Sequence, residues 1–232
     1  MNVFLLAHTP EPEKVVAAAA RCCYSNDDPD KLFDGLTTEK AREFIEKLGN
    51  LGHVSPLEHV SFTFAINGVS RVLLAQLTRH RIGVAFSVRS QRYNKFNGTY
   101  FMPETLINNK DLVDLYLDCM DGAGQDYDLM LKFGAQQEDA RMILPGAALT
   151  SLVMTMNARE LLHFFSLRCC SRASLEIQEL AGKIVKLVKE AAPTLFKKAC
   201  PSSEQLGYCP ENKMSCGRKI TLEKLLGGAN DA

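Results

Sequence analysis

The alternation of side chains in residues 59–66 limits the fold of this chain more than any other stretch. Its apolar residues fall on one face of an extended backbone: Val60, Phe62, Phe64 and Ile66. Such a period of two predicts a half-buried strand. Asn67-Gly68 predicts the end of that strand, and Val69, Val72, Leu73 and Leu77 recur at helical spacing after it. A strand followed directly by a helix is therefore expected.

The rest of the chain mixes both kinds of element. Strands are predicted over residues 1–6 and 149–156, and helices over 12–22, 38–48, about 110–133, 157–167 and about 172–192. Because there is no regular βαβ alternation, an α+β fold is favoured over a doubly wound one. The expectation is a central, mostly antiparallel sheet flanked by helices. No repeat or linker divides residues 1–232, so a single domain is predicted, with about 200–232 as a loop-rich C-terminal extension.

Composition excludes several classes of protein. The 232 residues carry 27 basic and 27 acidic side chains, and this neutral balance argues against a general nucleic-acid binder. No apolar run of about 18 residues exists, which argues against a membrane span. Met1 to Leu6 reads as a first strand and not as a signal peptide. The adjacent pairs Cys22-Cys23 and Cys169-Cys170 fall in apparent helices, which indicates buried free thiols and a cytoplasmic protein.

Three further cysteines lie near the C-terminus, at Cys200, Cys209 and Cys216. They contain no Cys-x-x-Cys pair and have no evident fourth ligand, so no metal site is predicted. A zinc clasp stays open as an alternative to a tail with incidental cysteines.

Positive charge and hydroxyl groups gather in residues 79–93. This segment holds four arginines, a histidine and two serines in a chain of zero formal net charge. Arginine presents a planar fork of donors that matches phosphate, so an anionic small molecule is the expected ligand. Apolar residues interleave with the polar ones, which predicts a partly buried, extended path from Ile82 to Tyr93.

Three other polar groupings accompany this segment: Gly52-His53-Val54-Ser55-Pro56-Leu57-Glu58-His59, Ala140-Arg141-Met142-Ile143-Leu144-Pro145, and Asn157 to Arg168. Asn157-Ala158-Arg159-Glu160 has the spacing of a capping box at a helix start. On an uninterrupted helix Arg168 lies about 140° from His163. Either that helix ends before Arg168, or the two side chains serve ligands on different faces. No glycine-rich phosphate loop is present, so a flavin or nucleotide would be bound in some other way.

Together the four groupings resemble the flavin-dependent (alternative) thymidylate synthases. The resemblance rests on Arg-His-Arg followed by Ser-x-Arg-Tyr, with Gly-His-x-Ser-Pro-x-Glu-His upstream and Ala-Arg-x-x-Leu-Pro and Asn-x-Arg-x-Leu downstream. One departure is an extra residue between Arg81 and Ser90, around Gly83. Glycine permits the bulge or turn that would absorb it.

The resemblance implies reductive methylation of dUMP to dTMP, with 5,10-methylenetetrahydrofolate as carbon donor and NADPH-reduced FAD as hydride source. It also implies a homotetramer with active sites shared between subunits, and no nucleic-acid or membrane partner. The implied FAD contacts are Ser55, Glu58, Arg79, His80, Arg81, Asn157, Arg159 and His163. The implied dUMP contacts are Gln76, Arg79, Ser90, Gln91, Arg92, Arg141 and Arg168. Arg168 is the implied catalytic residue, against the uracil ring, and His53 and Tyr93 lie toward the folate.

Two alternatives remain open at this point. The extra residue beside the nucleotide is compatible with flavin-dependent C5 modification of another pyrimidine nucleotide, such as hydroxymethylation. The basic residues 79–92 are also compatible with an RNA or DNA contact, which neutral net charge and the lack of a base-stacking aromatic series disfavour.

Overall fold

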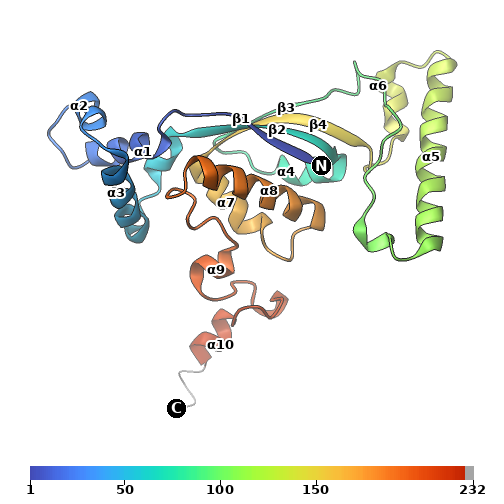
Figure 1. Cartoon of the computed structure of the whole chain (residues 1–232). Helices are drawn as coiled ribbons and strands as arrows, with labels where there is room; N and C mark the ends of the chain where they lie inside the picture. Colours follow the sequence, from blue (N-terminus) through green and yellow to red (C-terminus); the bar gives the residue numbers. More distant parts are fainter. Residues whose placement is uncertain (228–232) are drawn as a thin grey trace. The chain divides into compact units, whose positions relative to one another are not determined.

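The computed structural model describes residues 1–227, and within them four strands form one sheet in the order β1-β2-β4-β3 (Figure 1). The strands are β1 (Asn2–His8), β2 (Ser61–Ser70), β3 (Val84–Val88) and β4 (Leu149–Asn157). The α-helices are α1 (Pro12–Cys22), α2 (Pro29–Asp34), α3 (Thr38–Leu51), α4 (Arg71–Leu77), α5 (Lys110–Lys132), α6 (Gln137–Ala140), α7 (Ala158–Arg168), α8 (Leu175–Ala191), α9 (Ser202–Leu206) and α10 (Leu222–Gly227). Short 3-10 turns are η1 (Ser55–His59), η2 (Glu104–Leu106), η3 (Arg141–Ile143) and η4 (Asn212–Met214).

Neighbouring strands of the sheet run antiparallel. The end of β1 meets the start of β2, where the Thr9 N–H donates to the Ser61 carbonyl at 3.0 Å. The β3–β4 pair is framed by two bonds, from Asn157 N–H to Gly83 O at 2.8 Å and from Arg89 N–H to Ser151 O at 2.9 Å. The opposite directions of these pairings confirm the predicted α+β fold with an antiparallel sheet.

Backbone contacts divide the chain into two compact units. Unit 1 comprises residues 1–2, 65–79 and 86–154, and unit 2 comprises 3–64, 80–85 and 155 onward. Each of the four strands contributes residues to both units. The single domain over residues 1–232 therefore stays a prediction. Nowhere in residues 1–227 is a helix both long and apolar enough to cross a membrane.

Aromatic side chains build the core of unit 2. Phe62 of β2 meets Phe196 edge to face at 5.2 Å between ring centroids, and Phe196 meets Phe165 of α7 at 6.2 Å. All three side chains are fully buried. Helix α7 also packs against α8, and α1 packs against α2 and α3 (Figure 1). The alternating pattern of residues 59–66 thus supplies the strand face on which this core is built.

The predicted end of the strand over residues 59–66 is wrong. Strand β2 continues through Asn67-Gly68 to Ser70, with Gly68 at a φ of +70°. Val69 is fully buried as a strand residue, and not as the start of a helix. Helix α4 begins only at Arg71, because the Ser70 hydroxyl accepts from Leu73 N–H at 2.9 Å and caps it. Glycine lets the strand turn without ending it.

Other boundaries differ by smaller amounts. Helix α1 matches its predicted range, whereas α8 begins at Leu175, three residues after its predicted start. The predicted extended path from Ile82 to Tyr93 is a strand only over β3, after which the chain turns and Asn94 N–H donates to Ser90 O. The predicted C-terminal extension contains the short α9, η4 and α10, and its last residues, 228–232, lie outside the described range.

All eight cysteines are free thiols in the structure. The prediction that the adjacent pairs are buried is wrong for Cys22 and Cys23, which are exposed because they form the last position and the cap of α1. Cys169 and Cys170, just after α7, are partly covered. Desolvation raises the pKa of the Cys169 thiol to about 11, so this thiol stays protonated near neutrality.

Candidate functional site

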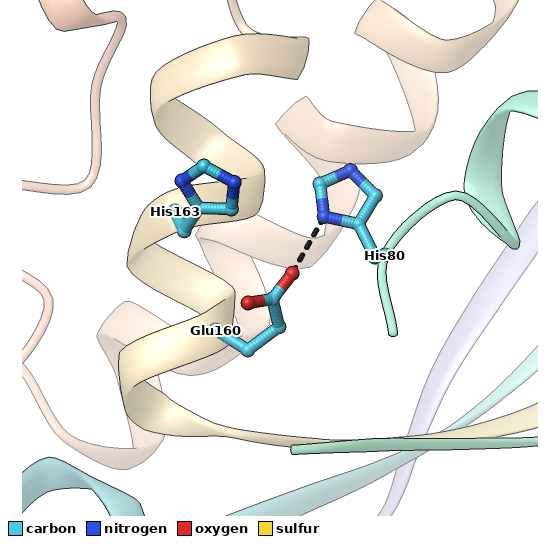
Figure 2. Close-up of side chains that lie close together, drawn as sticks. All are labelled: His80, Glu160 and His163. Atoms are coloured by element: carbon cyan, nitrogen blue, oxygen red, sulfur yellow. Dashed lines mark hydrogen bonds and ion pairs between the residues drawn. The ribbon is translucent and has the colours of Figure 1, made fainter. Parts of the chain in front are cut away.

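His80 occupies the centre of a polar cluster inside unit 2. Helix α4 ends at Leu77, and the segment that follows directs the His80 ring onto α7 with only 5% of the residue exposed. Figure 2 shows Glu160 and His163 rising from one helix while His80 approaches from the neighbouring segment. The His80 Nδ1 lies 2.6 Å from Glu160 Oε1. This is a buried contact between an imidazole and a carboxylate.

The first turn of α7 positions Glu160. Asn157 caps the helix, since its Oδ1 accepts from Glu160 N–H at 2.8 Å. The predicted helix start is confirmed, but the carboxylate of Glu160 bonds His80 and does not return to Asn157 as a full capping box requires. The Asn157 N–H donates instead to Gly83 O. The helix start and the exit of the Arg-His-Arg segment therefore meet at one junction.

Gly83 makes that junction possible. Its φ is +67°, and a Cβ added there would lie 2.1 Å from the Asn157 amide nitrogen. Only glycine satisfies both the conformation and the space. This turn lies just before β3 begins at Val84, and the expected extra residue between Arg81 and Ser90 stays a prediction.

The face of α7 that meets His80 is built from every fourth residue. Glu160, Phe164 and Arg168 lie at i, i+4 and i+8, and Arg168 Nε–H donates to His80 Nε2 at 3.1 Å. His163 lies on the exposed side, with its ring 5.8 Å from that of His80. The helix continues through Arg168, so the first alternative, an earlier end, is wrong. Both side chains nevertheless approach the His80 ring, so the second alternative, ligands on different faces, stays a prediction.

Burial controls the charge of His80. Desolvation lowers the pKa of His80 below its ordinary value of 6.5, the hydrogen bond and charge of Glu160 raise it, and Arg168 and His163 lower it. The net direction is downward, so the ring is neutral at pH 7.

The other predicted flavin residues in unit 2 are more exposed. Arg159 forms an ion pair with Glu58 of η1, joining two of the four sequence groupings. Ser55, Arg81 and His163 are exposed, and Asn157 is partly buried. His53, predicted on the folate side, forms a hydrogen bond of 3.3 Å between its Nδ1 and the Tyr24 hydroxyl.

Unit 1 contains a pocket of 360 Å³ at the predicted nucleotide residues Ser90 and Gln91. Its lining residues are Arg71, Arg89, Ser90, Gln91, Tyr93, Asn94, Lys95, Phe96, Asn97 and Thr150. None of these ten carries a negative charge. The lining therefore favours an anionic ligand.

Two polar atoms of this lining lack partners among the described residues. The hydroxyl of Thr150, a residue 2% exposed, and the Nε of Arg71 are buried without a hydrogen bond. Burial, followed by the charge of Arg141, lowers the pKa of Arg71, and its Nη2 donates to Arg89 O at 3.1 Å. Buried polar groups without partners are costly, which is the state expected of a site built for a ligand.

The remaining predicted nucleotide residues do not line the pocket. Arg92 forms an ion pair with Glu138 at 2.9 Å, and Arg141 Nε–H donates to the Glu138 carbonyl at 3.0 Å. One acidic residue thus anchors two of the predicted arginines. Gln76 is partly buried in α4 and Arg79 is exposed after it.

Sequence reasoning missed Arg71, Thr150 and Glu160. A signal existed for Thr150, because it takes a buried position of β4 alongside Leu152, Met154 and Met156. Glu160 was assigned only to helix capping, although it shares the i, i+4, i+8 relation with Arg168. No sequence signal distinguished Arg71 from a surface arginine.

Metal-ligating atoms within the described residues converge at His80, Glu160 and His163, whose donor atoms lie within 4.8 Å of one another. The guanidinium of Arg168 bonds the same imidazole and repels a further cation there. Cys200, Cys209 and Cys216 do not form such a group in this part of the chain.

Comparison with known sequences gives one family. The family model described as thymidylate synthase complementing protein matches residues 4–194. A flavin-dependent thymidylate synthase of Geobacter sulfurreducens is 43% identical over 228 residues, covering 97% of each chain. One from Clostridium tetani is 40% identical, covering 97% of this chain and 96% of the relative.

Solved structures resemble the fold. The flavin-dependent thymidylate synthase ThyX of Helicobacter pylori, solved with FAD and dUMP, superposes with a TM-score of 0.66 at 27% identity, covering 86% of this chain and all of that one. The UMP/dUMP methylase PolB of Streptomyces cacaoi, solved with 5-Br dUMP, has a TM-score of 0.75 at 23% identity, covering 85% and 93%. The second likeness extends to the fold alone.

Proposed function

Because the chain belongs to the thymidylate synthase complementing protein family, whose curated relatives are flavin-dependent thymidylate synthases, we propose how its two groups of site residues carry out that activity. The reaction is reductive methylation of dUMP: dUMP, 5,10-methylenetetrahydrofolate, NADPH and a proton give dTMP, tetrahydrofolate and NADP⁺. One observation carries the proposal. His80 of the Arg-His-Arg motif and Arg168 of the Asn-x-Arg grouping, 88 residues apart in sequence, are hydrogen bonded.

The residues of unit 2 fit FAD by their chemistry. Arg81 and Arg159 present exposed guanidinium groups, and Asn157 and Ser55 add neutral polar groups. A planar cation matches the pyrophosphate of FAD. Of the predicted flavin residues of this unit, Ser55, Glu58, Arg81, Asn157, Arg159 and His163 would hold the cofactor. The two ring nitrogens of His80 are already bonded to Glu160 and Arg168. When bound and reduced by NADPH, FAD supplies the hydride that no protein side chain offers.

The pocket of unit 1 fits the dUMP phosphate. Ser90 and Gln91 line it beside Arg71 and Arg89, and the unpaired Thr150 hydroxyl gives a further donor. Arg92, Arg141, Gln76 and Arg79 complete the proposed nucleotide set. A phosphate dianion would satisfy the Thr150 hydroxyl and the Arg71 Nε, which are buried without partners among the described residues.

Arg168 is the proposed catalytic residue. Methylation requires electron density on C5 of uracil, and a fixed guanidinium stabilises the negative charge that develops on the ring. Ser90 positions the nucleotide, because no general base of residues 1–227 lies bonded to its hydroxyl to make it a nucleophile. No cysteine is needed at the site.

The folate side is proposed at His53 and Tyr93. Beside the Tyr24 partner of His53, unit 2 holds a second pocket of 440 Å³ lined by Arg21, Tyr24, Ser25, Phe44, Lys47 and Leu48. Two cations and two aromatic rings suit a flat ring system with a carboxylate tail.

A homotetramer in the cytoplasm is the proposed state of the protein. Helix α5 supports an assembly, since large apolar side chains are exposed along it: Leu112, Leu115, Leu117 and Leu129. Such a surface is typical of one covered by another subunit. The free cysteines support a reducing compartment.

The test is direct. Purified protein should be yellow, and it should oxidise NADPH faster when dUMP is present and form dTMP when methylenetetrahydrofolate is added. A colourless protein that takes up neither FAD nor dUMP would overturn the proposal. Turnover of dCMP in place of dUMP would instead favour another pyrimidine nucleotide.

The role of Arg168 needs its own variant. Arg168→Ala should abolish dTMP formation while FAD stays bound, because the flavin contacts lie on other residues. Arg172→Ala is the matched control, since that guanidinium is close in sequence but forms an ion pair with Glu211. Full activity of Arg168→Ala would contradict the assignment.

A further inference from the structure

Glu160 has no assigned role beyond helix capping, yet its carboxylate is one of the best covered at the site. The Glu160 side chain is 12% exposed and that of His80 is 3% exposed. A carboxylate at such a place needs a partner, and its partner is the His80 ring at 2.6 Å.

The hydrogen bonds identify the tautomer of His80. An arginine Nε–H can only donate, so the His80 Nε2 that meets Arg168 must be an unprotonated acceptor. The ring proton then lies on Nδ1, where it is donated to Glu160 Oε1. Both ring nitrogens are therefore engaged by groups of the same chain.

With both nitrogens bonded within the chain, His80 serves a different role from a residue that forms hydrogen bonds to a ligand. Neither nitrogen can bind a cofactor without breaking one of two bonds. The imidazole instead links an anion, Glu160, to a cation, Arg168, on the same face of α7. The groups facing the ring are Glu160, His163 and Arg168, and a doubly protonated ring would turn its Nε2–H against the guanidinium.

We propose that Glu160 is a positioning residue, which holds His80 as the neutral Nδ1–H tautomer so that Nε2 fixes the orientation of the Arg168 guanidinium. The proposal rests on the proposed function, in which Arg168 meets the uracil ring. It adds that Glu160 sets the orientation of Arg168 indirectly, through the imidazole of His80 that lies between them. A glutamate that orients a histidine by accepting from one nitrogen is a known physical device.

The tautomer is measurable without any ligand. With ¹⁵N-labelled histidine, solid-state NMR of the purified chain should show His80 protonated on Nδ1 and bare on Nε2 at pH 7. The spectrum is tractable because the chain has five histidines, and His80→Asn assigns the signal. In Glu160→Ala the Nδ1–H loses its acceptor, so the His80 signals should shift. Glu160→Gln should preserve them, because its amide oxygen still accepts.

The rate of dTMP formation should depend on the tautomer of His80. The kcat for dTMP should fall on the order of 10-fold or more in Glu160→Ala, as when carboxylates that orient histidines are removed. FAD content should be unchanged, and Glu160→Gln should recover most of the activity. A wild-type ring protonated on Nε2, or an unchanged kcat in Glu160→Ala, would overturn the proposal.

Glu13→Ala separates positioning from stability. Glu13 is a buried carboxylate of the same unit, bonded to Arg42 Nε at 2.6 Å and to Thr194 N–H at 2.7 Å. Its loss should destabilise the fold while leaving the His80 signals in place. If the wild type made no dTMP, the proposed function would fail, yet the tautomer would still be tested by NMR alone.

Discussion

Gly83 can adopt its backbone conformation because it lacks a Cβ atom. Its positive φ costs any other L-residue about 1–2 kcal/mol, and a Cβ there also meets the Asn157 amide group. We expect Gly83→Ala to lower the free energy of unfolding by more than that strain and to weaken FAD retention. Urea denaturation and the flavin absorbance of the purified variant measure the two effects.

Gly134→Ala is the matched control for that change. Gly134 has a φ of +92°, but nothing lies within 4 Å of an added Cβ. It should therefore show the strain alone. Equal losses in the two variants would mean that the contact with Asn157 contributes nothing.

We expect the Thr150 hydroxyl to contribute to dUMP binding and not to the stability of the fold. Because it is buried without a partner, Thr150→Val should leave the free energy of unfolding unchanged or raise it by about 1 kcal/mol. The same variant should bind dUMP more weakly, which calorimetry measures.

A paired hydroxyl should behave in the opposite way. The Thr155 hydroxyl bonds that of Thr63 at 2.9 Å, so Thr155→Val should lower stability. If Thr150→Val destabilised the chain as much and left dUMP binding intact, the hydroxyl would be structural.

Helix α7 makes the stability of the fold depend on pH through His80. The folded pKa lies below the ordinary value of 6.5, so the unfolded chain binds a proton first as the pH falls. The contribution of the neutral ring is therefore present above pH 6.5 and is lost as the pH falls through the lower, folded pKa. Urea unfolding at pH 7.5 and pH 5.5 measures the loss.

His80→Asn tests whether the ring causes this dependence. An asparagine amide can still donate to Glu160 but does not titrate in this range. The fall in stability between the two pH values should be smaller in the variant than in the wild type. An identical fall would assign it to other groups.

Local patterns predicted the elements better than their ends. The period of two in residues 59–66 and the helix predicted over about 110–133 correspond to β2 and α5. The end of β2 was missed because Asn67-Gly68 has the composition of a turn, while pairing with neighbouring strands carries the chain on to Ser70. Hydrogen bonds between distant segments are not visible in local sequence.

The sequence predicted which residues belong to the site but not which of them are bonded to one another. The motifs identified His80 and Arg168, but the bond between them joins segments 88 residues apart. Glu160 looked like a capping residue because its spacing from Asn157 satisfied that simpler pattern. Burial of Thr150 and Arg71 depends on the packed chain, so only the structure identified them.

At the scale of the whole molecule, the exposed apolar side chains of α5 predict the assembly. Leu115 is 60% exposed, and Phe133, at the end of the helix, is 80% exposed. Introducing charge there with Leu115→Glu and Phe133→Glu should reduce the proposed tetramer to smaller species in analytical ultracentrifugation. An unchanged mass would exclude this face from the interface.

Leu206→Glu controls for the charge itself. Leu206 of α9 is also half exposed, and it lies in unit 2. The same substitution there should leave the sedimentation of the assembly unaltered. Activity should fall with assembly only in the α5 variant, if subunits share the active sites.

The start of α7 has a consequence for how an anionic cofactor is held. A helix usually offers its first amide groups to phosphate, but those of Asn157, Ala158 and Glu160 already donate to Gly83 O, Val60 O and Asn157 Oδ1. In the proposed flavin site the pyrophosphate would then depend on exposed guanidinium groups such as those of Arg81 and Arg159, whose charge dissolved ions screen. Retention of FAD should therefore weaken as ionic strength rises.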